Sequence, residues 1–92
     1  MASIEVRLPN LLASMIGEND CFSIEADTLR GALATIAEKH PKLALHVFDE
    51  SSDLRRHVLC FYNDTNTRWL DSLDVPLNAG DSLMFMQAVS GG

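Results

Sequence analysis

Two glycines, Gly91 and Gly92, close the sequence, and they are the residues with the clearest chemical use. Because glycine has no Cβ, a pair of them can enter a channel that is too narrow for any side chain. The terminal carboxylate, with a reference pKa of about 3.5, is ionised near neutral pH and resists nucleophiles until a reagent such as ATP converts it into a better acyl donor. The pair therefore suggests a carboxylate that is offered to another enzyme. The alternative interpretation is that the two glycines belong to a frayed chain end and have no function, since glycines are common at disordered chain ends.

Length, composition and charge indicate one globular domain whose partners are proteins. The 92 residues are 47% hydrophobic and 22% charged, which suffices for one core but not for a deep two-domain cleft, so an enzyme is disfavoured. A net charge of −6 would repel nucleic acid and anionic membrane surfaces and would favour partners with basic grooves. No stretch approaches the roughly 20 apolar residues that span a bilayer.

The other reactive side chains predict no catalytic or metal site. Cys21 and Cys60 have no paired spacing, so they indicate neither a disulfide framework nor a zinc site, and free thiols suit a cytoplasmic location. His57 and Cys60 would point to opposite faces of a strand and should not share a metal ion. No nucleophile-bearing turn accompanies the serine, histidine and aspartate residues, so hydrolase activity is disfavoured.

The first elements that could position the glycine pair are two strands joined as a hairpin. Apolar and polar residues alternate at the start of the chain, as in a strand with one buried face: the apolar ones are Ile4, Val6 and Leu8. Residues 11–20 then form a long connection with room for one helical turn over 11–14. A second strand follows over 21–25, with Phe22 and Ile24 facing inward.

Helical spacing follows the hairpin, because apolar residues recur at every third or fourth position: Leu29, Ala32, Leu33, Ile36 and Ala37. Thr28 is the expected N-cap, and Pro41 should end the helix near His40. A shorter helix is expected over 42–48, and a polar loop over 49–53.

The rest of the chain predicts strands at 58–62 and 82–89, with turns over 63–66 and 78–81 and a short fourth strand at 68–70 anchored by Trp69. The element order predicts an α+β protein with the β-grasp (ubiquitin-like) fold. This fold has a mixed sheet of four to five strands, one main helix packed across one face, and an open second face. The domain should span 1–88, and 89–92 should form a flexible tail.

Side-chain alternation predicts what the open face displays. Packing Leu83 and Phe85 against the helix sends their neighbours outward, and burying Val58, Cys60 and Tyr62 does the same on the other strand. The open face would then carry four large apolar side chains as a partner-binding surface: Leu59, Phe61, Met84 and Met86. The alternative is that 41–57 folds over this face and makes the four residues part of the core.

Four segments in this order resemble the ubiquitin-like sulfur carriers of the ThiS and MoaD type: Asp27-Thr28-Leu29, residues 58–64, residues 76–82 and the end Ala88-Val89-Ser90-Gly91-Gly92. The resemblance covers nearly the whole chain, and the family includes the thiamine sulfur carrier and the small subunit of molybdopterin synthase. It implies that an E1-like adenylyltransferase of the ThiF/MoeB type joins AMP from ATP to the carboxylate of Gly92. A sulfur donor enzyme would then form a thiocarboxylate, which donates its sulfur to a sulfur-accepting biosynthetic enzyme.

The same resemblance implies a carrier with no catalytic residue, bound cofactor or metal of its own. Gly92 would bear the sulfur, while Ser90 and Gly91 would enter the partner's active site. The longer middle over 41–57 looks most like carriers that serve cysteine biosynthesis or small sulfur-containing metabolites, and it disfavours a thiamine role. Some such carriers are trimmed after the diglycine by a metallopeptidase.

Three alternatives remain open at this point. The first is the small subunit of molybdopterin synthase. The second is a ubiquitin-like protein modifier that forms isopeptide bonds through Gly92. The third is a non-covalent β-grasp binding module in which the tail has no role.

Overall fold

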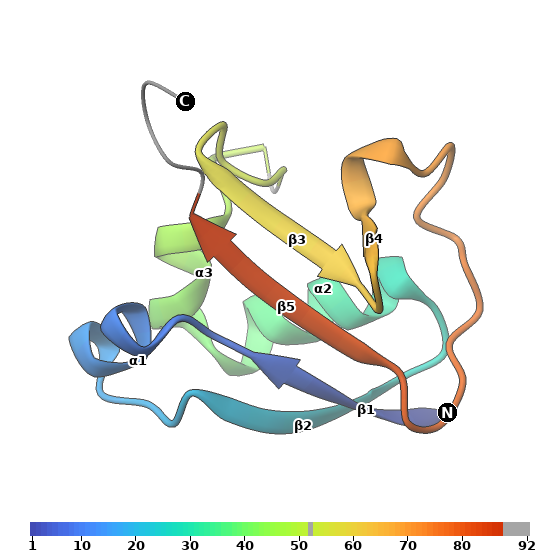
Figure 1. The fold of residues 1–92 in the computed structure, drawn as a ribbon, viewed down its shortest axis with the longest axis horizontal. Helices are drawn as coiled ribbons and strands as arrows, with labels where there is room; N and C mark the ends of the chain where they lie inside the picture. Colours follow the sequence, from blue (N-terminus) through green and yellow to red (C-terminus); the bar gives the residue numbers. More distant parts are fainter. Residues whose placement is uncertain (52, 88–92) are drawn as a thin grey trace.

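The computed structural model describes residues 1–51 and 53–87, which form a five-stranded sheet with helices packed against it (Figure 1). The elements in chain order are β1 (Ala2–Arg7), α1 (Asn10–Ile16), β2 (Cys21–Ala26), α2 (Leu29–Lys39), α3 (Pro41–Val47), β3 (Val58–Tyr62), β4 (Thr65–Asn66), the 3-10 helix η1 (Thr67–Trp69) and β5 (Ser82–Gln87). Ala88 and the predicted tail, 89–92, lie outside the described residues.

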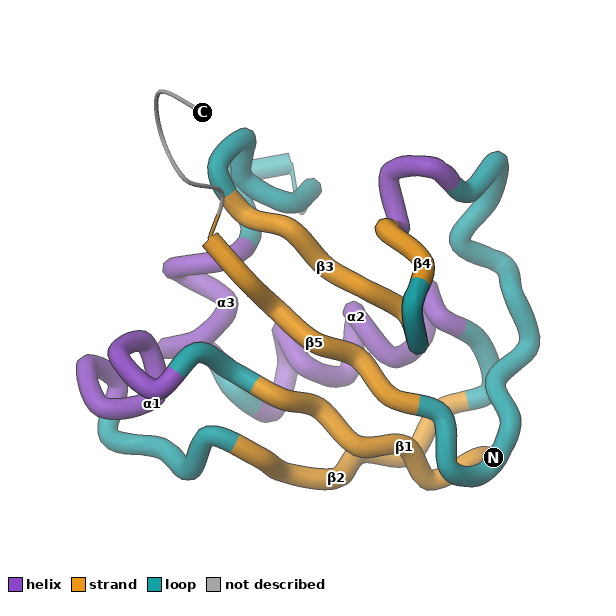
Figure 2. The backbone as a smooth tube through the Cα atoms, in the orientation of Figure 1, coloured by secondary structure: helices purple, strands orange, loops and turns teal. Residues whose placement is uncertain are grey.

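The strand order β2-β1-β5-β3-β4 places the first and last described strands side by side in the middle of the sheet (Figure 2). β1 pairs antiparallel with β2, as the predicted hairpin requires. It pairs parallel with β5, and β5 pairs antiparallel with β3. This mixed sheet, crossed on one side by α2, confirms the β-grasp fold that was predicted from the element order.

The main helix, α2, begins and ends where the sequence predicts. The Thr28 hydroxyl accepts a 3.1 Å hydrogen bond from the backbone N–H of Gly31, which satisfies one of the donors left free at a helix start. Leu29, Ala32 and Ile36 are completely buried against the sheet.

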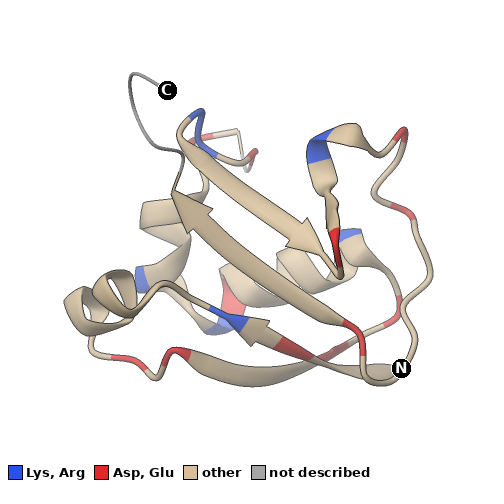
Figure 3. Ribbon diagram, viewed as in Figure 1, with Lys and Arg blue, Asp and Glu red and all other residues tan. Residues whose placement is uncertain are grey.

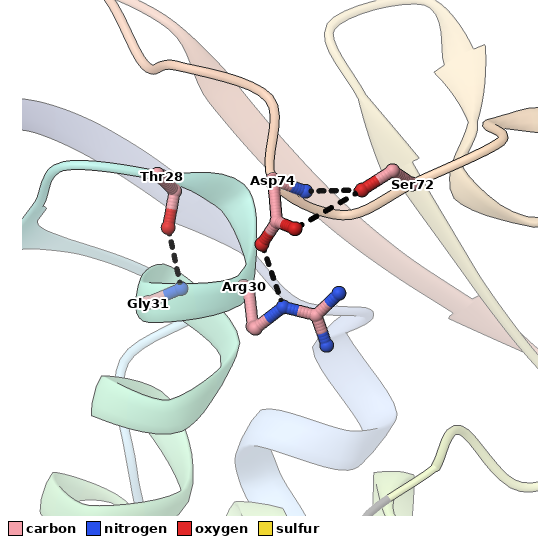
Figure 4. A network of polar contacts seen from close by, with 5 residues as sticks. All are labelled: Thr28, Arg30, Gly31, Ser72 and Asp74. Carbon is pink, nitrogen blue, oxygen red and sulfur yellow. Dashed lines mark hydrogen bonds and ion pairs between the residues drawn. The ribbon is translucent and has the colours of Figure 1, made fainter.

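A loop segment is tied to the start of this helix (Figure 4). The Arg30 guanidinium donates a 2.8 Å hydrogen bond to Asp74, whose backbone N–H donates to the Ser72 hydroxyl at 3.0 Å. The backbone N–H groups of Leu29 and Arg30 donate to the carbonyls of Val75 and Leu73. The connection between η1 and β5 is therefore held along the helix by both backbone and side-chain contacts.

The short helix α3 lies on the same side of the sheet as α2 (Figure 1). Leu43, Val47 and Phe48 are buried in the core, and the Phe48 ring meets the ring of Phe85 edge-on at 6.5 Å between centroids. Because Phe85 points toward the helices, the segment over 41–57 packs on the covered side. The alternative in which this segment folds over the open face is therefore wrong.

The predicted fourth strand at 68–70 is also wrong, because β4 is Thr65–Asn66 and the chain then turns into η1. The Asn66 side chain accepts a 3.0 Å hydrogen bond from the backbone N–H of Arg68 and so caps this turn. Trp69 is 77% exposed and anchors nothing, whereas Thr67 is buried. The small polar residue of this segment enters the core, and the large aromatic one does not.

Helix α1 is longer than the single turn expected between β1 and β2. It buries Leu12, Ala13 and Ile16 on one face and ends at Gly17, whose φ of 71° lies in the left-handed region that glycine tolerates. No helix in the described residues is long and apolar enough to cross a membrane.

Candidate docking face beside the last strand

The central strand β5 divides its side chains between the two faces of the sheet. Leu83 and Phe85 are 0% and 1% exposed, whereas Met84 and Met86 are 40% and 44% exposed. The helices α2 and α3 cover the side that Leu83 and Phe85 face (Figure 1). The alternation predicted for this strand is confirmed, and both methionines lie on the open face.

The neighbouring strand β3 completes an apolar patch, which we define as Leu59, Phe61, Met84 and Met86. Leu59 lies directly opposite Met86, and Phe61 lies opposite Met84. Residues paired in this way have Cβ atoms about 4.5–5.5 Å apart, so the four side chains form one continuous surface. Leu59 and Phe61 are half-buried rather than fully exposed.

The inward side of β3 matches its prediction at two of three positions. Val58 and Cys60 are buried, but Tyr62 is only partly buried. The Tyr62 hydroxyl donates a hydrogen bond to the carboxylate of Asp81, which holds the polar end of the ring at the edge of the core.

The open face changes from apolar to charged toward β1 and β2. The strand registers place Cys21, Arg7 and Met84 in one row across the sheet. β3 and β5 contain no charged residue, whereas β1 carries Arg7 and Glu5 (Figure 3). The guanidinium of Arg7 donates a 2.6 Å hydrogen bond to Glu5, and this contact lowers the pKa of the Glu5 carboxyl. A partner on this face would therefore meet an apolar half and a polar half.

A groove of about 570 Å³ adjoins the apolar patch where β1, α1 and β5 meet. It is lined by Met84 and Met86 from the patch and by Arg7, Cys21 and the exposed Leu11 from the N-terminal part of the chain. We call it the flanking groove. Sequence reasoning missed these three N-terminal residues, because only the parallel pairing of β1 with β5 brings them beside the methionines.

Neither thiol of the chain is a strong nucleophile at neutral pH. Complete burial raises the pKa of the Cys60 thiol to about 12. Desolvation, followed by a hydrogen bond with Glu5, raises the pKa of the exposed Cys21 thiol. Because the thiolate is the reactive form, both shifts lower the reactivity of these thiols near neutral pH.

Metal-binding residue types do not cluster in the described part of the chain. No group of three His, Cys, Asp or Glu side chains is placed there to hold a metal ion. His57 is exposed in the turn before β3, so it does not lie on the predicted strand, whereas Cys60 is buried within β3.

The predicted tail residues Ser90, Gly91 and Gly92 lie outside the described residues. The candidate site that the structure does describe consists of the apolar patch and the flanking groove. Both include residues of β5, which ends at Gln87.

Comparison with known proteins finds a matching family, and relatives that align with this chain over nearly its whole length. A model of the ThiS family matches residues 6–92. The sulfur carrier protein CysO of Mycobacterium tuberculosis is 27% identical in an alignment of 92 positions that covers 98% of this chain and 99% of the relative.

Solved structures agree with the fold. The crystal structure of SAMP1 from Haloferax volcanii is 29% identical, with a TM-score of 0.76 and coverage of 99% of this chain and 100% of that one. The small archaeal modifier protein 1 of Methanosarcina acetivorans is 26% identical, with a TM-score of 0.77 and coverage of 100% and 98%.

Proposed function

Because the chain belongs to the ThiS family, we propose that it is a sulfur carrier protein that bears sulfur on the carboxyl group of Gly92. One observation carries this proposal: the family match continues through Gly91 and Gly92. The match to CysO, which spans nearly the whole of both chains, supports the same role.

The proposed cycle begins with activation of the Gly92 carboxylate. An E1-like adenylyltransferase joins AMP from ATP to this carboxylate and releases pyrophosphate. The acyl adenylate is electrophilic where the carboxylate is not, so sulfur from a sulfur donor enzyme can displace AMP and leave a thiocarboxylate. A sulfur-accepting enzyme then takes the sulfur into cysteine or a sulfur-containing metabolite, and water supplies the oxygen that restores the Gly92 carboxylate.

In this proposal the partner enzymes supply all catalytic groups. The carrier supplies a docking surface and a C-terminal tail that enters the partner's active site. The apolar patch is the contact for the adenylyltransferase, because exposed apolar side chains gathered on one face favour an interface and methionine adapts to more than one partner. The net charge of −6 favours an enzyme with a basic docking surface. Gly91 and Ser90 pass through the entrance to the active site, where the absence of a Cβ at Gly91 matters most.

Mass spectrometry of the intact protein tests the cycle. After incubation with the cognate adenylyltransferase, ATP and a sulfur source, we expect the mass of the carrier to increase by about 16 Da. This is the difference when sulfur displaces AMP from the acyl adenylate and one sulfur replaces one oxygen of the carboxylate. Deleting Gly92 should abolish this gain. No gain with an adenylyltransferase that exchanges pyrophosphate into ATP in the presence of this carrier would disprove sulfur loading.

Matched variants separate the tail from the rest of the chain. Gly91→Ala adds one Cβ in the tail and should slow loading, whereas Ser90→Gly removes a side chain and should leave loading unchanged. Equal loading of both variants would contradict the proposed role of the narrow entrance, but it would not contradict the formation of a thiocarboxylate.

A second candidate function is covalent modification of other proteins through Gly92. It is favoured by the similarity to SAMP1, whose name in Methanosarcina acetivorans describes a small modifier protein. Its sign would be adducts of higher mass in cell extracts that survive reducing agent and disappear when Gly92 is deleted. A thiocarboxylate without such adducts would favour the carrier alone.

A further inference from the structure

A second hollow lies on the helix-covered side of the sheet, away from the apolar patch. One part of it, of about 770 Å³, is lined by α2, α3 and the loop that follows α3. An adjoining part of about 400 Å³ continues toward η1. The two parts share five lining residues, so we treat them as one helix-side groove: Arg30, Leu33, Phe48, Asp53 and Leu73.

Apolar side chains line both parts of the helix-side groove, and we call these side chains its floor. Leu33, Phe48 and Leu73 line both parts, and Leu54 and Leu70 extend the floor toward η1. At the other end Leu45 of α3 is 73% exposed, although its neighbour Val47 is buried in the core. An exposed leucine at the mouth of an apolar groove gives a partner side chain a surface to cover.

The groove is also lined by acidic side chains, which we call its rim. Five carboxylates line it: Glu38, Asp49, Glu50, Asp53 and Asp71. Within the described residues, no ion pair involves any of these five side chains. Their negative charges can therefore attract an incoming cation, although the Asp49 carboxylate also accepts hydrogen bonds from the backbone N–H groups of Ser51 and Asp53.

The three arginines of the same lining already donate to groups of the chain. Arg30 donates to Asp74 (Figure 4), and Arg55 donates to the carbonyl of Leu45 at 3.2 Å. Arg68 donates to three carbonyls, those of Arg55, Arg56 and Val58. Hydrogen bonds to neutral carbonyls leave the positive charges of Arg55 and Arg68 in place. The lining is nevertheless negative overall, because its five carboxylates outnumber its three arginines, and this adds a local preference to the net charge of the chain.

We propose that the helix-side groove binds a segment of a partner protein whose apolar side chains are flanked by lysine or arginine. The apolar side chains cover Leu33, Phe48 and Leu45, and the cations meet the rim carboxylates. Complementary charge selects such a segment over an acidic one and speeds its encounter with the groove.

The helix-side groove and the apolar patch lie on opposite sides of the sheet, so the groove can bind a second partner. The apolar patch faces away from α2 and α3, so a partner in the helix-side groove does not compete with one on the open face. The chain can therefore hold two proteins at once. This inference does not depend on sulfur loading and holds equally for a modifier or a binding module.

NMR titration of the full chain with three synthetic peptides tests the proposal. The three peptides have the same apolar residues and differ only in the residues that flank them. Their flanking residues are four lysines, four glutamines or four glutamates. The lysine peptide should shift the amide signals of Leu33, Leu45 and Phe48 and bind about tenfold or more tightly than the glutamine peptide, as expected when charge and apolar contacts act together. The glutamate peptide should not bind.

Two substitutions of the same kind locate the binding. Leu45→Glu should weaken binding of the lysine peptide about tenfold, since it removes the apolar side chain that the peptide covers at the mouth of the groove. Met86→Glu on the open face should change this binding less than about twofold. Both side chains are substantially exposed, so neither change threatens the fold.

The remaining outcomes each overturn the proposal. They are no binding of the lysine peptide, shifts centred on Met84 and Met86, and binding that Leu45→Glu leaves unchanged, which would show non-specific attraction to an acidic protein. Shifts at Leu45 that appear on concentrating the protein alone, and that block the lysine peptide, would assign the groove to a second copy of the chain instead.

Discussion

The Tyr62 hydroxyl donates a 2.5 Å hydrogen bond to the carboxylate of Asp81, which ties the end of β3 to the residue before β5. The backbone N–H of Asn78 donates to the same carboxylate at 2.8 Å. The Asn63 side chain accepts a 3.0 Å hydrogen bond from the backbone N–H of Ser82. The start of the strand that leads toward the predicted tail is therefore fixed from two neighbouring turns.

This contact predicts a loss of stability in alkaline solution. The hydrogen bond to Asp81, followed by burial, raises the pKa of Tyr62 from 10.0 to about 12. The unfolded chain releases the phenol proton near pH 10, whereas the folded chain keeps it until about pH 12. The free energy of unfolding should therefore fall as pH rises through this window. Urea unfolding followed by circular dichroism from pH 8 to pH 12 measures it.

Tyr62→Phe provides the control, because it removes the titrating group and keeps the ring. Its free energy of unfolding should fall less steeply above pH 10 than that of the wild type. Near neutral pH the variant should be less stable by about 1 kcal/mol or less, since water can replace the lost donor at this partly exposed site. Parallel pH profiles would show that Tyr62 does not titrate differently in the two states.

The two cysteines should differ in reactivity toward a thiol reagent. Cys21 is exposed, whereas Cys60 is completely buried with its pKa raised to about 12 by burial. Native protein at pH 8 should take up one label and denatured protein two, measured by intact mass. Cys21→Ser should take up none while folded. Rapid labelling of this variant would mean that the core opens readily around Cys60.

The apolar patch predicts a binding defect that spares the fold. Met86→Glu places a carboxylate beside Leu59, where a docked partner would bury it, so the KM for the carrier in adenylation should rise about tenfold or more. Met15→Glu is the matched control, because Met15 is 63% exposed on α1 and belongs to neither the patch nor the flanking groove. Its KM should change less than about twofold. Equal effects of the two changes would point to overall charge rather than to the patch.

The cap of α2 predicts a measurable change in stability. Thr28→Ala removes the hydroxyl that accepts from the Gly31 N–H, and it should lower the free energy of unfolding by about 1 kcal/mol. Thr28→Ser keeps the acceptor and should cost a few tenths of that amount. Urea unfolding at pH 7 compares the two variants. Similar losses would assign the effect of Thr28 to its methyl group instead.

Local patterns in the sequence are sufficient to predict the covered side of the sheet. Alternation in β1 and β5 and helical spacing in α2 follow directly from which side chains are apolar, so these patterns alone place Val6, Leu83 and Ile36 in the core, where all three are buried. The same alternation directs Met84 and Met86 outward. These predictions need no information about which strands are neighbours.

Long-range pairing and side-chain hydrogen bonds account for what sequence reasoning missed. The flanking groove depends on β1 lying beside β5, which no local pattern encodes. The turn at η1 depends on Arg68 reaching the carbonyls of Arg55 and Val58, a contact that apolar spacing cannot indicate. Trp69 suggested an anchor by its residue type, yet Thr67 fills that place.

The central position of β5 also constrains how the molecule is made. Its partners β1 and β3 do not pair with each other, so until β5 is synthesised and inserted the sheet consists of two separate pieces. Pairing the first strand with the last is a contact of high sequence separation, which makes folding slower than in a protein of mostly local contacts. A ribosome-bound chain that lacks β5 has neither the methionines nor the surface that they complete. The surface that we propose for docking is therefore complete only after β5 has joined the sheet.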